Sequence, residues 1–274
     1  SKPISNLPRL RFGNMPNDGG GLLFTITEYA DAINQYPQLV PYFKKFIGSD
    51  EFINGGLRYC LWLNKEKYEE IKSIPLVQKR ISITKQHREK SKDKGTNKLA
   101  LTPWKFRDTH EANKYSIVIP AVSSENRFYI PMGLVGADTV LSNRVYAIYD
   151  ADIYLLGILM SRMHMTWVKA VGGRLETRYN YSAGLCYNTF PLPELSTTRK
   201  NRIIEVVLKI IDIREEMGET LAELYNPLTM PLDLKEVHEE LDGIVDRAYR
   251  QRGFENDEER LSLLLNMYQK MTGE

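Results

Sequence analysis

The chain has 274 residues, of which 42% are hydrophobic, which is enough for one large domain or two ordinary ones with real cores. Its formal net charge of +2 does not by itself indicate nucleic-acid binding, so any basic surface must come from how charge is distributed along the chain. Cys60 and Cys186 lack a CxxC spacing, and no apolar stretch approaches the roughly 18 residues of a membrane span. We therefore expect a cytoplasmic protein without zinc, disulfides or a membrane segment.

The first part of the chain is predicted to be irregular. Proline at positions 3, 8 and 16 and the run Gly19-Gly20-Gly21 prevent a long regular element in residues 1–24. From Thr25 the apolar residues return at helical spacing, and Pro37 and Pro41 interrupt them. This pattern predicts a short helix followed by a helical turn.

The middle of the chain mixes strand and helix signals. Short runs rich in aromatic and β-branched residues predict strands at residues 57–63, 115–120, 128–131 and 145–148. Residues 150–170 predict one long helix, with Asp150 or Asp152 as its cap.

The last part of the chain contains only helical patterns. Apolar residues at three- and four-residue steps predict helices over residues 199–225 and 233–250, with Gly253 placed to end the second. Asn256 and Glu259 form a capping-box pattern at the start of a third. We therefore expect an α+β fold: a lead-in at 1–24, a domain of small mixed sheets and helices at 25–195, and a helical bundle at 196–274.

Positive charge is concentrated in residues 79–107, which hold ten basic and two acidic side chains. The segment is polar and lacks an apolar period, so we expect an exposed loop or arm. Its cations are candidate contacts to DNA phosphates, with a solvated surface loop as the equal alternative. The candidates are Lys85, Arg88, Lys90 and Lys92.

A hypothesis that the chain is a nuclease rests on Asp50 and the Glu70-Ile71-Lys72 triplet. These residues resemble the acidic residues and ExK spacing of Mg²⁺ nucleases. A solvated helix explains the same charged stretch completely. The chain has no nucleophile elbow, phosphate-binding loop or HExxH motif, and the NPPY-like tetrapeptide of an adenine methyltransferase is also missing. We expect no catalytic centre and no bound metal in this chain.

An alternating polar row follows a glycine pair near residue 173. Glu176, Arg178 and Asn180 are two residues apart, so in an extended segment all three side chains point to one side. Arginine pairs with the O6 and N7 acceptors of guanine, and glutamate accepts from the cytosine amino group. A solvent-facing strand edge is the plain alternative.

Several longer strings make the chain recognisable. It resembles the C-terminal part of the MmeI-like type IIL restriction-modification enzymes over nearly its whole length, in the strings FGNMPNDGG, IGSDEFINGGLRYCLWL, IPAVSSENRFYIP, SRMHMTWVKAVGGRLETRYNYS, YNTFPLP and LDGIVDRAY. The resemblance implies a parent enzyme that methylates adenine N6 with S-adenosylmethionine, flips the base out of the duplex, and requires Mg²⁺ if its nuclease is present. The chain would be its DNA target-recognition part, with residues 1–24 as the tail of the methyltransferase domain.

The resemblance also assigns roles to residues. It implies base contacts by Glu176, Arg178 and Asn180, and a second base-contacting position near Asn143 and Arg144. The chemistry of Ser123, Ser124, Arg127 and Arg174 suits phosphate contact or structural support. Expected partners are double-stranded DNA and the methyltransferase domain of the same polypeptide. A protein-interaction module that uses the helical tail is the alternative.

Overall fold

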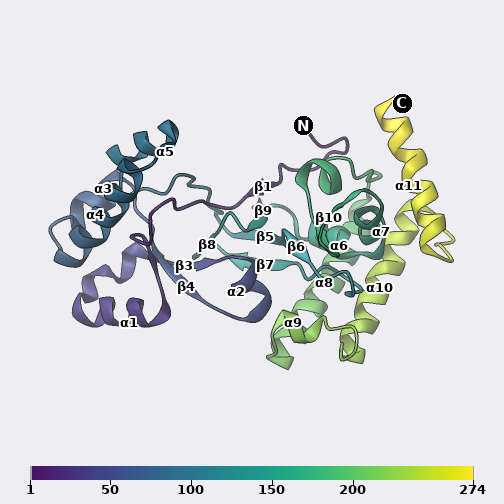
Figure 1. Cartoon of the computed structure of the whole chain (residues 1–274). Helices are drawn as coiled ribbons and strands as arrows, with labels where there is room; N and C mark the ends of the chain where they lie inside the picture. Colours follow the sequence, from purple (N-terminus) through teal and green to yellow (C-terminus); the bar gives the residue numbers. More distant parts are fainter. Residues whose placement is uncertain (1, 274) are drawn as a thin grey trace. The chain divides into compact units, whose positions relative to one another are not determined.

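The structure is a computed structural model that describes residues 2–273 (Figure 1). Contacts divide the chain into two compact units. Unit 1 lies within residues 1–11, 114–135 and 146–274, and unit 2 within 12–113 and 136–145. This division does not follow chain order, because segments from the middle of the sequence pack with the C-terminal helices. None of the helices in the described range has the length and apolar character needed to span a membrane.

Unit 2 is built on a four-stranded sheet in the order β2-β4-β3-β8. Its strands are β2 Leu23–Phe24, β4 Arg58–Leu61, β3 Phe43–Ile47 and β8 Thr139–Leu141. Neighbours are antiparallel except for β3 and β8. The predicted short helix is confirmed as α1 Ile26–Gln35, which Thr25 and Glu28 cap reciprocally, and the helical turn follows as η1 Pro37–Tyr42.

Four more helices complete this unit: α2 Ser49–Asn54, α3 Lys65–Ile71, α4 Pro75–Glu89 and α5 Lys94–Lys98, with the 3₁₀ turn η2 Leu99–Leu101. The loop or arm predicted for the basic segment is therefore wrong. Helix α4 buries a stripe at three- and four-residue steps, made of Val77, Ile81, Thr84 and Arg88. Only two of these four are apolar, which is why the period is hard to recognise in the sequence.

Two small sheets lie in the middle of the sequence. One has the order β1-β9-β5-β7, with β1 Arg11–Phe12, β9 Val145–Tyr149, β5 Tyr115–Pro120 and β7 Gly133–Gly136. The other has the order β10-β11-β6, with β10 Gly173–Leu175, β11 Arg178–Asn180 and β6 Val122–Ser123. The strands predicted at 115–120 and 145–148 are confirmed. The strand predicted at 128–131 is wrong: these residues form a bend and an irregular segment. The aromatic signal reflects burial, since the Tyr129 side chain is buried and its hydroxyl donates to Asp242 of a C-terminal helix.

The long helix predicted for residues 150–170 is two helices, α6 Ile153–Met160 and α7 Arg162–Val171. Ser161 between them is extended, with ψ 158°, and its hydroxyl caps α7 by accepting the His164 N–H. Helix α6 packs on α8 Thr197–Met217 at Gly157, where an added Cβ would lie 2.4 Å from Cγ2 of Ile203.

The remaining helices are α9 Leu221–Leu224, α10 Leu232–Tyr249 and α11 Asp257–Thr272, and a π-helical turn, η3, covers Ala183–Tyr187. Helices α8 and α10 contact each other along their apolar stripes, as do α7 and α11. The α+β fold with a helical C-terminal region is confirmed (Figure 1).

Candidate nucleic-acid interface

The strands β10 and β11 form an exposed hairpin with a two-residue turn, because Leu175 pairs with Arg178. In β11 Arg178 and Asn180 are exposed, while Tyr179 between them is buried. Arg178 and Asn180 therefore lie on one exposed face, as the alternation predicted. Glu176 does not belong to this row, since it occupies the turn.

Glu176 has an unusual backbone conformation. Its φ is +58°, a left-handed value that costs a residue with a Cβ about 1–2 kcal/mol. Its carboxylate forms an ion pair with Nη2 of Arg178 at 2.7 Å, and both side chains are largely exposed. The tip of the hairpin thus presents a carboxylate and a guanidinium side by side. Strain of this kind is found most often at functional sites.

The SSENR string supports this hairpin from the other side. Strand β6 pairs antiparallel with β11, with Ser123 opposite Tyr179. Ser123 is buried, so its hydroxyl serves as a weak acceptor for the Arg127 guanidinium at 3.5 Å instead of facing solvent. The Arg174 guanidinium lies 4.0 Å from the centroid of the Tyr179 ring, which gives it a packing role as well as an exposed charge.

A basic pocket of about 320 Å³ lies beside Arg127. It is lined also by the cations of Arg162, Lys169 and Lys235 and by two carboxylates, those of Glu125 and Glu239. Arg162 pairs with Asp257 at 2.7 Å, and Lys235 is 3.9 Å from Glu239. Within the described residues, no ion pair forms at Arg127 or Lys169. Burial lowers the pKa of Arg127, which reflects the cost of desolvating this guanidinium. An anion in the pocket would offset that cost.

The predicted residues of unit 2 form a separate set. Arg144 is exposed at the turn between β8 and β9, and its carbonyl accepts the Ser49 hydroxyl at 2.6 Å. The neighbouring Asn143 is half-buried and donates its backbone N–H to Asn14. The turn is thereby fixed while the Arg144 side chain stays exposed.

The basic segment of unit 2 divides into exposed and buried cations. Lys85, Lys90 and Lys92 are accessible, with Lys85 3.8 Å from Glu89. Arg88 is fully buried, so its predicted phosphate contact is wrong. Its five N–H groups donate to five backbone carbonyls, those of Pro16, Asn17, Leu99, Thr102 and Lys105. Since an arginine has five such donors, none is left for DNA.

The residues of the nuclease alternative have separate local partners. Asp50 accepts from the Asn54 amide, Glu70 from the Tyr42 hydroxyl, and Lys72 pairs with Glu69. Residues 2–273 hold no group of three His, Cys, Asp or Glu side chains that could bind a metal ion. Asp50, Glu70 and Lys72 therefore do not come together in one metal-binding site in the described structure.

Lys169 and Lys235 were not among the residues predicted from the sequence. Each is one lysine among many, and only the packing of α7 and α10 places them around a pocket with Arg127. The spacing of residues in the sequence also does not reveal that Arg127 is half-buried with one weak side-chain hydrogen bond, because this depends on the fold.

Comparisons with known proteins show which family the chain resembles. Residues 1–194 match the family model "MmeI, target recognition domain", and residues 195–274 match "MmeI, C-terminal domain". DNA methyltransferase A of Bacillus subtilis (strain 168) is 79% identical over 272 residues, covering 99% of this chain and 31% of that protein. A solved structure of the type IIL restriction-modification enzyme MmeI in complex with DNA matches with a TM-score of 0.93 and 42% identity, over 100% of this chain and 37% of the other. The chain thus spans about a third of the length of these relatives.

Proposed function

Since the chain belongs to the MmeI target-recognition and C-terminal domain families, we propose that it selects the DNA sequence on which a longer restriction-modification enzyme acts. The observation that carries the proposal is the exposed Glu176–Arg178 pair at the tip of the hairpin. The related enzyme MmeI has been solved in complex with DNA, which supports duplex DNA as the partner.

The hairpin carries the chemistry of base contact. The Arg178 guanidinium can donate two hydrogen bonds to guanine O6 and N7, and Glu176 can accept one from the cytosine amino group. Together they suit the two edges of one G·C pair in the major groove. Asn180 on the same exposed face has the donor and acceptor that match adenine N6 and N7. Asn143 and Arg144 are proposed as a second base-contacting position.

The duplex backbone would be held by exposed cations that carry no sequence information. In unit 1 these are Lys169 and Lys235 at the basic pocket and Arg174. The half-buried Arg127 lines the same pocket, and the carbonyl of Ser124 accepts its backbone N–H. In unit 2 they are Lys85, Lys90 and Lys92. Their number is consistent with an affinity that falls steeply as salt is added, because bound phosphates release counterions.

The proposal extends to the longer protein. We infer that a methyltransferase domain elsewhere in the same polypeptide binds S-adenosylmethionine and methylates adenine N6, with Mg²⁺ needed only if a nuclease is present. The 79% identity to a protein named DNA methyltransferase A supports this inference. We also propose a cytoplasmic location, since both cysteines are free thiols and the DNA of a bacterium is there.

Selection from a pool of random duplexes tests the proposal. The 274-residue chain should retain DNA that shares a short sequence motif. Arg178→Ala should lose the preference at one base pair, at a cost of about 1–3 kcal/mol in discrimination. Arg202→Ala serves as the control, because Arg202 is an exposed arginine on α8 that pairs with Glu205 and Glu240. An unchanged motif in Arg178→Ala would remove the base-contacting role from the hairpin.

A further inference from the structure

The two residues proposed as the second base-contacting position, Asn143 and Arg144, lie in the middle of a tight turn between β8 and β9. The backbone N–H of Val145 donates to the carbonyl of Ser142 at 3.2 Å, which closes a four-residue β-turn. Serine is favoured as the first residue of such a turn, because its hydroxyl can accept a backbone N–H two residues on. Here the Ser142 hydroxyl accepts the N–H of Arg144 at 3.2 Å. The local sequence therefore favours this turn.

Two neighbouring backbone segments of unit 2 hold the same turn. The N–H of Ser142 donates to the carbonyl of Ile47 at the end of β3, at 2.9 Å, and the N–H of Asn143 donates to the carbonyl of Asn14 at 3.2 Å. Gly13 allows the second segment to come this close, since an added Cβ would lie 2.3 Å from the Ser142 carbonyl oxygen. These bonds join backbone atoms, so they do not depend on which side chains the turn carries.

The carbonyl of Arg144 is held by a side chain from another element. The hydroxyl of Ser49, the first residue of α2, donates to this carbonyl at 2.6 Å. The start of α2 fits against the turn because residue 48 is glycine: an added Cβ there would lie 2.8 Å from the Ser142 hydroxyl oxygen. The Gly48 N–H donates to the Glu51 carboxylate at 2.8 Å, which fixes the start of the helix. Ser49 thus restrains the peptide group that follows Arg144.

The Arg144 side chain extends from this turn into solvent. Arg144 is exposed, and no carboxylate among residues 2–273 forms an ion pair with it. Arg178 differs, because Glu176 pairs with its guanidinium at 2.7 Å. With no ion pair to orient it, the direction of the Arg144 guanidinium depends on the backbone that carries it. A long side chain amplifies a small rotation of its backbone, so base contact by Arg144 needs a fixed turn.

We propose that Ser49 is a specificity-determining positioning residue, which fixes the turn from which Asn143 and Arg144 reach the DNA bases. This inference rests on the proposed base contacts of these two residues. The single O–H donor of Ser49 is used by the Arg144 carbonyl, so Ser49 acts through the turn. Helix α2 thereby has a part in the choice of DNA sequence.

Five variants of the 274-residue chain test it. Arg144→Ala identifies the base pair that the turn contacts. Ser49→Ala removes the hydroxyl, whereas Ser49→Thr keeps it, and Ser142→Ala removes the other hydroxyl that bonds the turn. Ser73→Ala is the matched control, because Ser73 is an exposed serine of unit 2 that lies before α4. Affinity is measured on the duplex selected from the random pool and on every single-base change of it, and the melting temperature is measured alongside.

Ser49→Ala should lower discrimination at the base pair affected by Arg144→Ala by about three- to tenfold, the range that one hydrogen bond contributes. Ser142→Ala should have a similar effect, because the N–H of Arg144 loses its acceptor. Discrimination at the other base pairs and the salt dependence should be unchanged. Ser49→Thr and Ser73→Ala should behave as wild type.

If Arg144→Ala alters the motif while Ser49→Ala does not, the inference is overturned and the proposed function stands. A uniform loss at every base pair with a lowered melting temperature also overturns it, since Ser49 would then serve stability alone. If Arg144→Ala leaves the motif unchanged while Arg178→Ala alters it, the turn does not contact bases and the inference fails, but the hairpin keeps its role. If wild type selects no motif, the proposed function itself fails.

Discussion

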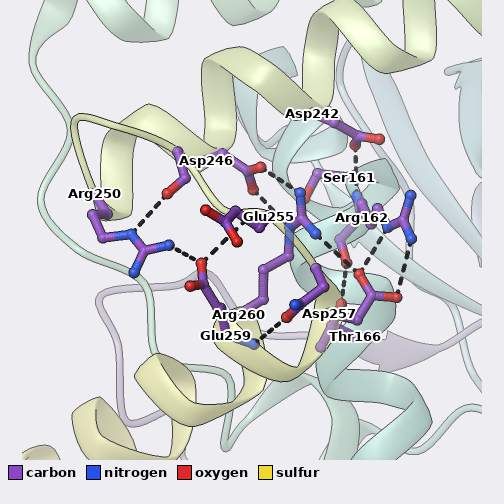
Figure 2. A network of polar contacts seen from close by, with 12 residues as sticks. Ser161, Arg162, Thr166, Asp242, Asp246, Arg250, Glu255, Asp257, Glu259 and Arg260 are labelled. Atoms are coloured by element: carbon purple, nitrogen blue, oxygen red, sulfur yellow. Dashed lines mark hydrogen bonds and ion pairs between the residues drawn. The ribbon is translucent and has the colours of Figure 1, made fainter.

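The carboxylate of Asp242 on α10 accepts a hydrogen bond from the Tyr129 hydroxyl at 2.7 Å. Its other oxygen accepts the backbone N–H of Arg162, the first residue of α7, also at 2.7 Å (Figure 2). Asp242 thus joins the loop after β6 to two helices. Burial raises the pKa of Asp242 to about 7, against the two hydrogen bonds that lower it. This connection therefore depends on a group that changes its charge near neutral pH.

The contribution of Asp242 to stability should fall as pH rises toward neutrality. A carboxyl with a raised pKa binds its proton more tightly in the folded state, so its contribution is complete below the unfolded value of about 4 and is lost as pH rises through 7. The free energy of unfolding should decrease by up to roughly 1.4 kcal/mol per pH unit from this group. Asp242→Asn should lack that slope, and Glu236→Gln, an exposed change on the same helix, should keep it. Urea unfolding between pH 5 and 8 measures the difference, and equal slopes in wild type and Asp242→Asn would contradict it.

Substitution of Arg88 should lower the stability of the protein without removing a contact to DNA. Arg88→Ala leaves five backbone carbonyls without their donor and opens a cavity, so we expect a loss of about 3 kcal/mol or more. Arg88→Lys keeps the charge but supplies only three donors, so it should recover part of the loss. If Arg88→Lys matches wild type in thermal unfolding, the carbonyl contacts are not what requires arginine here.

Elements with strong local patterns could be predicted from the sequence. Local residue patterns were enough to predict α8 and α10, from their regularly spaced apolar residues, and the strand Tyr115–Pro120, from its β-branched residues. The break at Ser161 was not predicted, because apolar residues continue through it and a serine is acceptable inside a helix. Helix α4 was missed because its buried stripe includes Arg88, a residue type that is almost always exposed.

The candidate site was predicted in part. Alternation placed Arg178 and Asn180 on one exposed face, since a strand repeats every two residues. The left-handed backbone of Glu176 has no sequence signal, because glutamate rarely takes that conformation. The basic pocket could not be predicted, because it forms where α7 and α10 pack beside Arg127. These segments are far apart in the sequence, so no local pattern indicates the pocket.

The exposed lysines of the basic segment should contribute to affinity without affecting sequence choice. Lys90→Gln and Lys92→Gln each remove a charge that has no carboxylate partner in the described part of the chain. If each contacts one phosphate, each change should make the negative slope of log affinity against log salt less steep by about 0.9. The selected motif should stay the same. Titrations at several salt concentrations measure the slope, and a slope equal to that of wild type would leave this segment outside the DNA interface.

Breaking the buried ion pair between α10 and α11 should lower the free energy of unfolding far more than breaking an exposed ion pair. Arg260 is 7% exposed and donates to both oxygens of Asp246, at 3.1 and 2.6 Å (Figure 2). Arg260→Ala leaves the Asp246 carboxylate buried and unpaired, which should cost about 3–5 kcal/mol. Arg202→Ala breaks an exposed pair with Glu240 and should cost at most about 1 kcal/mol.

The double change Arg260→Met with Asp246→Leu separates charge from packing. Because it removes both buried charges, it should recover most of the stability that Arg260→Ala loses. Urea unfolding of the three variants and wild type measures the free energies. If the double variant is as unstable as Arg260→Ala, the loss comes from packing between the helices, and the unpaired carboxylate is not its cause.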